Sequence, residues 1–155
     1  MLKFRKAKEE DVDLIFNWSN DPLVRQFSYN QEQIVYKDHM KWFNSKIKDN
    51  NASFYIFINE LDEEIGLVRI EINNNEVIIG ILIDKKQRGK SYATKMLTMA
   101  SDHFYCHNPL KSITAYIKKD NIASIKSFTK AGFVYSEELK VNNIPSVKLI
   151  KVNSL

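Results

Sequence analysis

An apolar segment that runs directly into a basic loop constrains this chain more than any other feature. Residues 77–83 are apolar almost throughout, which is typical of a strand at the centre of a sheet. The loop at 84–90 carries three lysines and an arginine, and the apolar spacing from Ser91 to Phe104 predicts a helix. The first N–H groups of a helix have no partner within it, so the loop and the helix start together form an anion site.

The residues of this loop narrow the kind of anion site. The loop lacks the Gly-x4-Gly-Lys-Ser/Thr spacing of a P-loop and the three glycines of a dinucleotide-binding fingerprint. Its cationic side chains suit a phosphate or a pyrophosphate. The alternative is an ordinary basic loop in which Ser91 caps the following helix.

The remaining patterns predict one α+β domain over residues 1–155. Alternating apolar residues and turn signals indicate strands at 2–7, 53–58, 65–72, 77–83, 112–117, 133–141 and 146–152. Helical spacing indicates helices at 9–20, 35–48, 91–104 and 121–131. We expect a mixed central sheet of about seven strands flanked by about four helices. The strands between residues 53 and 83 are expected to form an antiparallel meander.

The composition limits where such a domain works and what it binds. The chain has 155 residues, one cysteine and a net charge of +4, so we expect no internal disulfide and a cytoplasmic location. No apolar run is long enough to span a membrane, and the residues from Met1 predict no export signal. The basic clusters, at 85–90 and at Lys118-Lys119, do not form the concentrated stripe of a nucleic-acid binder. His103, Cys106 and His107 lack a fourth ligand, so we expect no metal.

A second motif follows the next predicted strand. It consists, in order, of Asn121, Ser124, Phe128, Gly132 and Phe133, with an asparagine placed to cap a helix and a glycine placed to end it. The first motif contributes Arg88, Ser91 and Ala93. Together the two motifs resemble the GNAT superfamily of N-acetyltransferases, whose loop reads Gln/Arg-x-x-Gly-x-Gly/Ala. The resemblance covers nearly the whole chain, because the order and size of the predicted elements also fit.

The resemblance implies acetyl-CoA as co-substrate. Backbone amides of residues 88–93 would hold its pyrophosphate, the central strand would pair with its pantetheine arm, and Asn121 would anchor that arm. Transfer in this family is direct attack of a free amine on the thioester. The implied cofactor-binding residues are Ile81, Leu82, Ile83, Arg88, Gly89, Lys90, Ser91, Tyr92, Ala93, Asn121 and Ser124.

Two positions depart from the family pattern. Ser91 stands where the loop has a glycine, although its backbone N–H is still present. Phe128 stands where a tyrosine often serves as general acid, and a phenyl ring has no proton to donate. Ser124 or a water is the expected replacement, unless the thiolate leaves unaided.

The amino-terminal third bears on the acceptor. It resembles the branch of the family that acetylates nucleotide-linked amino sugars of the pseudaminic-acid type, while the branch acting on ribosomal-protein N-termini shares the Asn-Asp-Pro-x-Val-Arg segment at residues 20–25. The expected acceptor-binding residues are Arg25, Ser28, Asn30 and Trp42, with His39 as a proton relay. Each has a structural alternative: Trp42 and His39 as core residues, and Arg25 in a helix cap or an ion pair.

Glu71 is the leading candidate for general base. It lies on the strand beside the apolar one, and alternation along that strand places it on the same face as Arg69. Glu76, at the turn into the apolar strand, is the second candidate. The alternative is an exposed Arg69–Glu71 pair that contributes less than about 1 kcal/mol. The expected catalytic set is Glu71, His39 and Ser124.

The sequence therefore predicts an N-acetyltransferase that moves an acetyl group directly from acetyl-CoA to a primary amine of a nucleotide-linked amino sugar. A protein N-terminus or another amine is the alternative acceptor. A catalytically inactive CoA-binding module is the alternative from another class, and Phe128 favours it. We expect no nucleic-acid or membrane partner, and the sheet edge with the last strands permits a homodimer.

Overall fold

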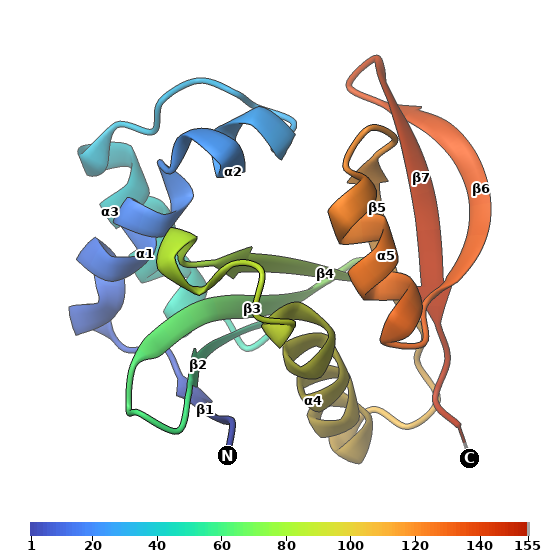
Figure 1. Cartoon of the computed structure of the whole chain (residues 1–155), viewed down its shortest axis with the longest axis horizontal. Coiled ribbons are helices and arrows are strands. Elements are labelled where there is room, and N and C mark those ends of the chain that lie inside the picture. Colours follow the sequence, from blue (N-terminus) through green and yellow to red (C-terminus); the bar gives the residue numbers. More distant parts are fainter. Residues whose placement is uncertain (155) are drawn as a thin grey trace.

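The chain folds around one seven-stranded sheet, and the computed structural model describes residues 1–154 (Figure 1). The strand order is β1-β2-β3-β4-β5-β7-β6, and every neighbouring pair is antiparallel except β4 with β5. The strands are β1 (Lys3–Lys6), β2 (Ala52–Ile58), β3 (Glu64–Asn73), β4 (Glu76–Ile83), β5 (Ile113–Lys118), β6 (Val134–Val141) and β7 (Ile144–Lys151). The helices are α1 (Val12–Ser19), α2 (Pro22–Phe27), α3 (Tyr36–Lys48), α4 (Tyr92–His107) and α5 (Ile122–Lys130). No helix in this described part is long and apolar enough to cross a membrane.

The predicted α+β fold with seven strands is confirmed, as is the antiparallel meander of β2, β3 and β4. The described residues form five α-helices, one more than the four ranges that helical spacing indicated. The additional helix, α2, begins at Pro22, where Asp21 accepts hydrogen bonds from the N–H groups of Leu23 and Val24. A proline at the first helical position and an aspartate before it both favour a helix start. A segment that resembled a turn therefore forms a short helix.

The pairing of β4 with β5 ends almost as soon as it begins. These parallel strands share one paired position, Ile78 with Thr114, whereas β3 and β4 are paired over eight positions. Beyond Ile78 the two strands separate, so their facing N–H and C=O groups have no strand partner there. The sheet thus opens as a wedge between its β1–β4 half and its β5–β7 half, with α4 packed beneath (Figure 1).

Two apolar clusters hold helices on opposite faces of the sheet. The cluster on the α4 face includes the buried residues Val68, Ile70, Met96 and Leu97. The cluster on the face covered by α1 and α3 includes Ile15, Trp18, Phe43 and Leu67. Side chains alternate between the two faces along a strand. Arg69 and Glu71 of β3 therefore lie on the same face as Leu67.

Gly66 on β3 allows β4 and α4 to approach closely. A methyl group at this position would overlap the carbonyl oxygen of Leu82 and lie 2.9 Å from Met96 Cε. We predict that Gly66→Ala lowers the free energy of unfolding by at least about 2 kcal/mol, because backbone atoms must move. Gly80→Ala is the control, since its methyl group would meet only the movable side chain of Arg69, at 3.1 Å. Equal losses for both variants in urea unfolding would contradict this explanation.

Candidate active site

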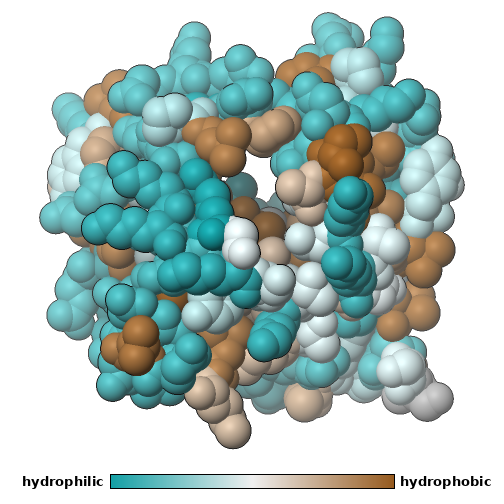
Figure 2. Space-filling model, in the orientation of Figure 1, coloured by the Kyte–Doolittle hydropathy of each residue, from teal (hydrophilic) through white to brown (hydrophobic). Residues whose placement is uncertain are grey.

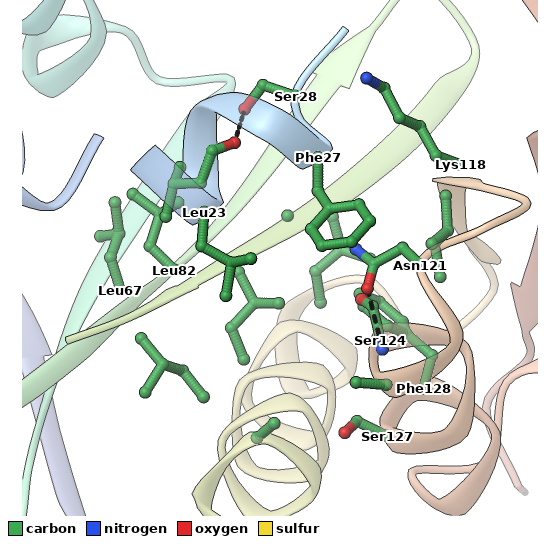
Figure 3. A pocket seen from close by; sticks show the side chains of 18 of the residues that line it. Leu23, Phe27, Ser28, Leu67, Leu82, Lys118, Asn121, Ser124, Ser127 and Phe128 are labelled. Atoms are coloured by element: carbon green, nitrogen blue, oxygen red, sulfur yellow. Dashed lines mark hydrogen bonds between the residues drawn. The ribbon is translucent and has the colours of Figure 1, made fainter. Parts of the chain in front are cut away.

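A cavity of about 790 Å³ occupies the wedge between the two halves of the sheet. Figure 2 shows this face of the molecule hollowed at its centre, with apolar atoms deep inside. The walls come from α2, β3, β4, the loop before α4, the start of α4, β5 and α5. In Figure 3, Leu23 and Phe27 reach into the cavity from α2, and the ring of Phe27 lies beside Asn121, the residue that caps α5. The wedge therefore gathers residues from segments that lie far apart in the sequence.

The structure brings nearly all of the predicted cofactor-binding residues to this cavity. Those that line it are Ile81, Leu82, Ile83, Arg88, Gly89, Ser91, Tyr92, Ala93, Asn121 and Ser124. Lys90 is the exception, because it does not line the cavity, although its Nζ donates a hydrogen bond at 3.1 Å to Oε1 of Gln87, which does.

The loop before α4 owes its shape to two residues with positive φ. Gly89 has a φ of 76°, and Ser91 has a φ of 64° and a ψ of 25°. This left-handed conformation costs a residue with a side chain about 1–2 kcal/mol, which gives a physical reason for glycine in the family pattern. The Ser91 side chain does not cap α4, contrary to the ordinary-loop alternative. The first N–H groups of the helix therefore remain available to a ligand anion.

Two side-chain contacts hold this loop against the amino-terminal helices. Asp84 accepts a hydrogen bond from the indole of Trp18 at 2.9 Å, and Arg88 donates one to Asp21 at 2.8 Å. Burial raises the pKa of Asp21, but the hydrogen bond and charge of Arg88 outweigh it and hold this pKa below its usual value. Because the Arg88 guanidinium pairs with Asp21, the backbone N–H groups are the part of the loop that remains available to an anion.

The end of the cavity beside this loop is here called the cofactor end, and helix α5 forms the wall opposite the loop. Asn121 Oδ1 accepts a hydrogen bond from the N–H of Ser124 at 3.3 Å, so Asn121 caps the helix while it lines the cavity. Phe128 is 3% exposed, and its ring meets Phe133 edge to face with 5.1 Å between ring centroids. This phenyl ring closes the apolar floor of the cavity.

The other end of the cavity, here called the acceptor end, lies on the α1–α3 face of the sheet. Arg69 and Glu71 of β3 line it together with Tyr116 and Lys118 of β5. The Tyr116 hydroxyl donates a hydrogen bond to Glu76 at 2.5 Å, and burial together with this carboxylate raises the pKa of Tyr116 to about 12. The acceptor end is therefore richer in charged groups than the cofactor end.

Glu71 is the carboxylate that reaches this end of the cavity. Its Oε1 is buried without a hydrogen-bond partner among residues 1–154, and Lys46 Nζ lies 3.4 Å from it. No other acidic side chain in the described part of the chain lines the cavity. Glu76, the second candidate for general base, lies outside the lining and accepts the hydrogen bond from Tyr116. The ion pair of Glu71 is with Lys46, and the alternative pair with Arg69 is not found among residues 1–154.

Arg25 does not reach the cavity, contrary to its expected acceptor-binding role. Its guanidinium donates hydrogen bonds to the carbonyls of Ser19 at 2.7 Å and Asn30 at 2.8 Å, and to Ser28 Oγ at 3.2 Å. Asn30 is exposed and lies outside the lining, whereas Ser28 lines the cavity. Arg25 therefore holds the loop after α2 in place, and Ser28 alone of these three residues lies at the candidate site.

His39 and Trp42 also lie outside the cavity lining. His39 is 2% exposed, and its Nε2 lies 2.9 Å from the carbonyl oxygen of Val12, so this nitrogen carries the proton and donates it. This core position does not support the proton relay expected for His39. The ring of Trp42 lies 5.7 Å from Arg69 Cζ and stacks on that guanidinium. Trp42 therefore contacts the site through Arg69 rather than through a ligand.

Two cations at the acceptor end were not expected as site residues. Arg69 was considered only as a partner for Glu71, and Lys118 only as part of a basic cluster. Alternation along β5 could have indicated the position of Lys118. Ala115 and Ile117 point into the core on one face, so Lys118 must lie on the opposite face. Within residues 1–154, no three His, Cys, Asp or Glu side chains gather as a metal site requires.

The conformation of Ser91 leads to a prediction about acetyl-CoA. If backbone N–H groups hold the pyrophosphate, Ser91→Gly should leave the Kd for acetyl-CoA within about twofold of the original value. Ser91→Val should raise this Kd at least about tenfold, because a β-branched residue resists positive φ. Isothermal titration calorimetry measures both values. A large loss of affinity in Ser91→Gly would show instead that the hydroxyl binds the cofactor.

The burial of His39 leads to a prediction about stability. Burial lowers the pKa of His39, although the Val12 carbonyl and the charge of Asp13 oppose this. Below about pH 6.5 the unfolded chain binds a proton at this position before the folded protein does, so stability falls as the pH falls. Between about pH 7.5 and pH 5.5, His39 should lower the unfolding free energy of the original protein by up to about 1.4 kcal/mol. We predict that this part of the decrease is absent in His39→Gln.

Urea unfolding at the two pH values provides the measurement, and His107→Gln is the matched control. His107 is exposed on α4, so its replacement should leave the pH dependence unchanged. An unchanged pH dependence in His39→Gln would refute the prediction.

Comparison with known proteins relates this architecture to a family. Residues 1–134 match the profile described as "Acetyltransferase (GNAT) domain". Acetyltransferase PseH of Campylobacter jejuni is 23% identical over 142 residues, which cover 89% of this chain and 87% of that protein. An uncharacterized protein of Methanocaldococcus jannaschii is 27% identical over 147 residues, and the match spans 89% of this chain but only 29% of that protein's length.

A solved structure shows the same fold. Spermidine N-acetyltransferase from Vibrio cholerae, in complex with CoA and spermine, superposes with a TM-score of 0.87 at 20% identity. The superposition covers 99% of this chain and 96% of that one. The family assignment rests on the profile match, which spans most of the chain. Together with the splayed sheet and the left-handed loop before α4, this match establishes that the chain belongs to the GNAT family of acetyltransferases.

Proposed function

We propose that this chain transfers an acetyl group directly from acetyl-CoA to the primary amine of a nucleotide-linked amino sugar. Acetyl-CoA lies in the wedge, with its pyrophosphate on the N–H groups of residues 88–93 and its pantetheine arm along β4. The unpaired backbone groups beyond Ile78 support this placement, because they are free to bond an extended ligand. The proposal includes a cytoplasmic location, which the single cysteine favours.

The chemistry requires a neutral amine, a donor to the oxyanion and a proton for the departing thiolate. We assign removal of the ammonium proton to Glu71, acting through a water, because its Oε1 is buried without a hydrogen-bond partner among residues 1–154. An unpaired N–H of β4 stabilises the oxyanion. Ser124, which lines the cofactor end, or a water protonates the thiolate, since Phe128 cannot.

We choose a nucleotide-linked acceptor because of the charges at the acceptor end. The charged side chains that line the cavity are Arg69, Glu71, Arg88 and Lys118. Arg88 pairs with Asp21 and Glu71 pairs with Lys46, so the two charges without a counter-ion among the described residues are both positive. A polycation such as spermine would meet like charge here, whereas the phosphates of a nucleotide-linked sugar are attracted.

A panel of acceptors tests the proposal, with turnover followed as thiol release from acetyl-CoA. The panel holds a nucleotide-linked amino sugar, the same sugar without its nucleotide, spermidine, and a peptide with a free N-terminus. We expect kcat/KM to be at least about 100-fold higher for the nucleotide-linked sugar than for spermidine, because attraction replaces repulsion. Turnover of spermidine or peptide alone would overturn the acceptor. Tight acetyl-CoA binding without turnover of any amine would favour a CoA-binding module.

Glu71→Gln tests the proposed base. We predict a fall in kcat of at least about 100-fold with little change in the Kd for acetyl-CoA, because the amide cannot accept the proton. The rate of the unchanged enzyme should rise from neutral to mildly alkaline pH as deprotonation of the amine becomes easier. Glu76→Gln is the control, since Glu76 lies outside the cavity lining. Loss of activity in Glu76→Gln alone would transfer the role to that carboxylate.

A further inference from the structure

Arg69 carries a guanidinium that has no anionic partner in an ion pair among residues 1–154. It lines the cavity, and it makes no hydrogen bond or ion pair with any residue of the described chain. Trp42 stacks on it at 5.7 Å, and Gly80 leaves room for it, since a Cβ there would lie 3.1 Å from Nε. Arg69 is exposed, so its guanidinium is open to the cavity and to an incoming ligand.

Lys118 is a buried ammonium without a counter-ion. It is 5% exposed, its Nζ donates a hydrogen bond to the carbonyl of Gln26 at 3.0 Å, and it lies 5.9 Å from the ring centroid of Tyr29. No carboxylate within residues 1–154 pairs with it, whereas the next residue, Lys119, pairs with Glu138 at 3.1 Å. Figure 3 shows its amino group on the α2 side of the cavity, as the bond to Gln26 requires. A buried charge of this kind is costly unless an ion of opposite sign approaches it.

The two cations lie on the same face of neighbouring parts of the sheet. Arg69 and Lys118 both point to the face opposite α4, on either side of β4, and both line the acceptor end. The charge of Arg69 adds to burial in lowering the pKa of Arg25, so a third cation lies nearby with its own bonds already made to the loop after α2. The local field is therefore positive, and a ligand anion would compensate it.

We propose that Arg69 and Lys118 form a phosphate subsite that holds the nucleotide phosphate of the acceptor, an inference that rests on the proposed function. Arginine binds phosphate oxygens in a bidentate manner, and lysine binds them as a point charge. Glu71 lies two residues beyond Arg69 on the same face of β3, about 7 Å along the strand. A single sugar ring bridges that distance, with its phosphate at Arg69 and its amine at Glu71. The subsite thereby sets which end of the acceptor meets the thioester.

Binding of uridine diphosphate to CoA-saturated protein tests the subsite, because CoA already fills the loop before α4. We expect Arg69→Met and Lys118→Met each to weaken this binding about 10–100-fold in calorimetry, the usual effect of losing a charge-assisted bond. Uridine, which has no phosphate, should bind weakly to the original protein and both variants. The Kd for CoA should stay unchanged, which verifies the fold. Lys119→Met is the matched control and should leave the affinity for uridine diphosphate within about twofold.

The outcomes separate this inference from the proposed function. Unchanged affinity for uridine diphosphate in Arg69→Met would overturn the subsite, even where nucleotide-linked amino sugars are acetylated. Weakened binding in Arg69→Met without turnover of any such sugar would support the subsite and overturn the proposed acceptor. An equal loss in Lys119→Met would overturn the subsite as well, because it would reduce the effect to general surface charge. If Lys118→Met does not fold, Arg69→Met decides alone, since its side chain is open to the cavity and lies outside the core.

Discussion

The contact between Ile78 of β4 and Thr114 of β5 is the one paired position that joins the two halves of the sheet within residues 1–154. Continued pairing would use the backbone groups of both strands and close the wedge. The strands instead diverge, while α4 contacts β3, β4 and α5 and so supports both halves from one face. The open strands leave polar backbone groups that only water or an extended ligand satisfies. The cavity is thus a consequence of incomplete pairing, and its walls are whatever side chains the diverging strands present.

Side-chain contacts also join the loop at one end of the cavity to the helices at the other. The loop after β4 leaves the sheet at the wedge, and Arg88 ties it to Asp21, the residue that caps α2. The bond between Trp18 and Asp84 ties the same loop to α1. Helix α2 covers the acceptor end, so the loop that is proposed to hold the cofactor and the helix over the acceptor share their supports. These two part-buried contacts are the side-chain hydrogen bonds that join the loop to the amino-terminal helices.

The features that could be predicted from the sequence are those that local rules determine. The strands follow from alternation, the anion loop from its composition, and the cap at Asn121 from its position before a helix. The short helix α2 could be read either as a helix or as a turn, because Asp21 and Pro22 favour both. The positive φ of Ser91 could not be predicted from the serine itself. The glycine at this position of the family pattern is the one sign of it.

The acceptor residues were harder to predict because the same residue types serve two purposes. Arg25, His39 and Trp42 have side chains suited to a sugar phosphate, yet their helices turn them to backbone carbonyls, to the core and to Arg69. Which face of a helix becomes cavity depends on how the sheet splays, and no local pattern encodes that. Their actual contacts are nonetheless informative, because Trp42 orients the guanidinium that does line the cavity.

Lys118 and Lys119 show most directly why position decides the role of a charge. The two are neighbours of one chemical type, but Lys119 is exposed and paired with Glu138, whereas Lys118 is buried without a carboxylate among the described residues. A surface pair of the first kind contributes little to stability, while an unpaired buried ammonium lowers it. Arg69 of β3, on the other side of β4, also has no carboxylate in an ion pair among the described residues, but it is exposed to the cavity. Both cations line the end of the wedge where the acceptor is proposed to bind, and there a ligand anion would compensate the buried charge of Lys118.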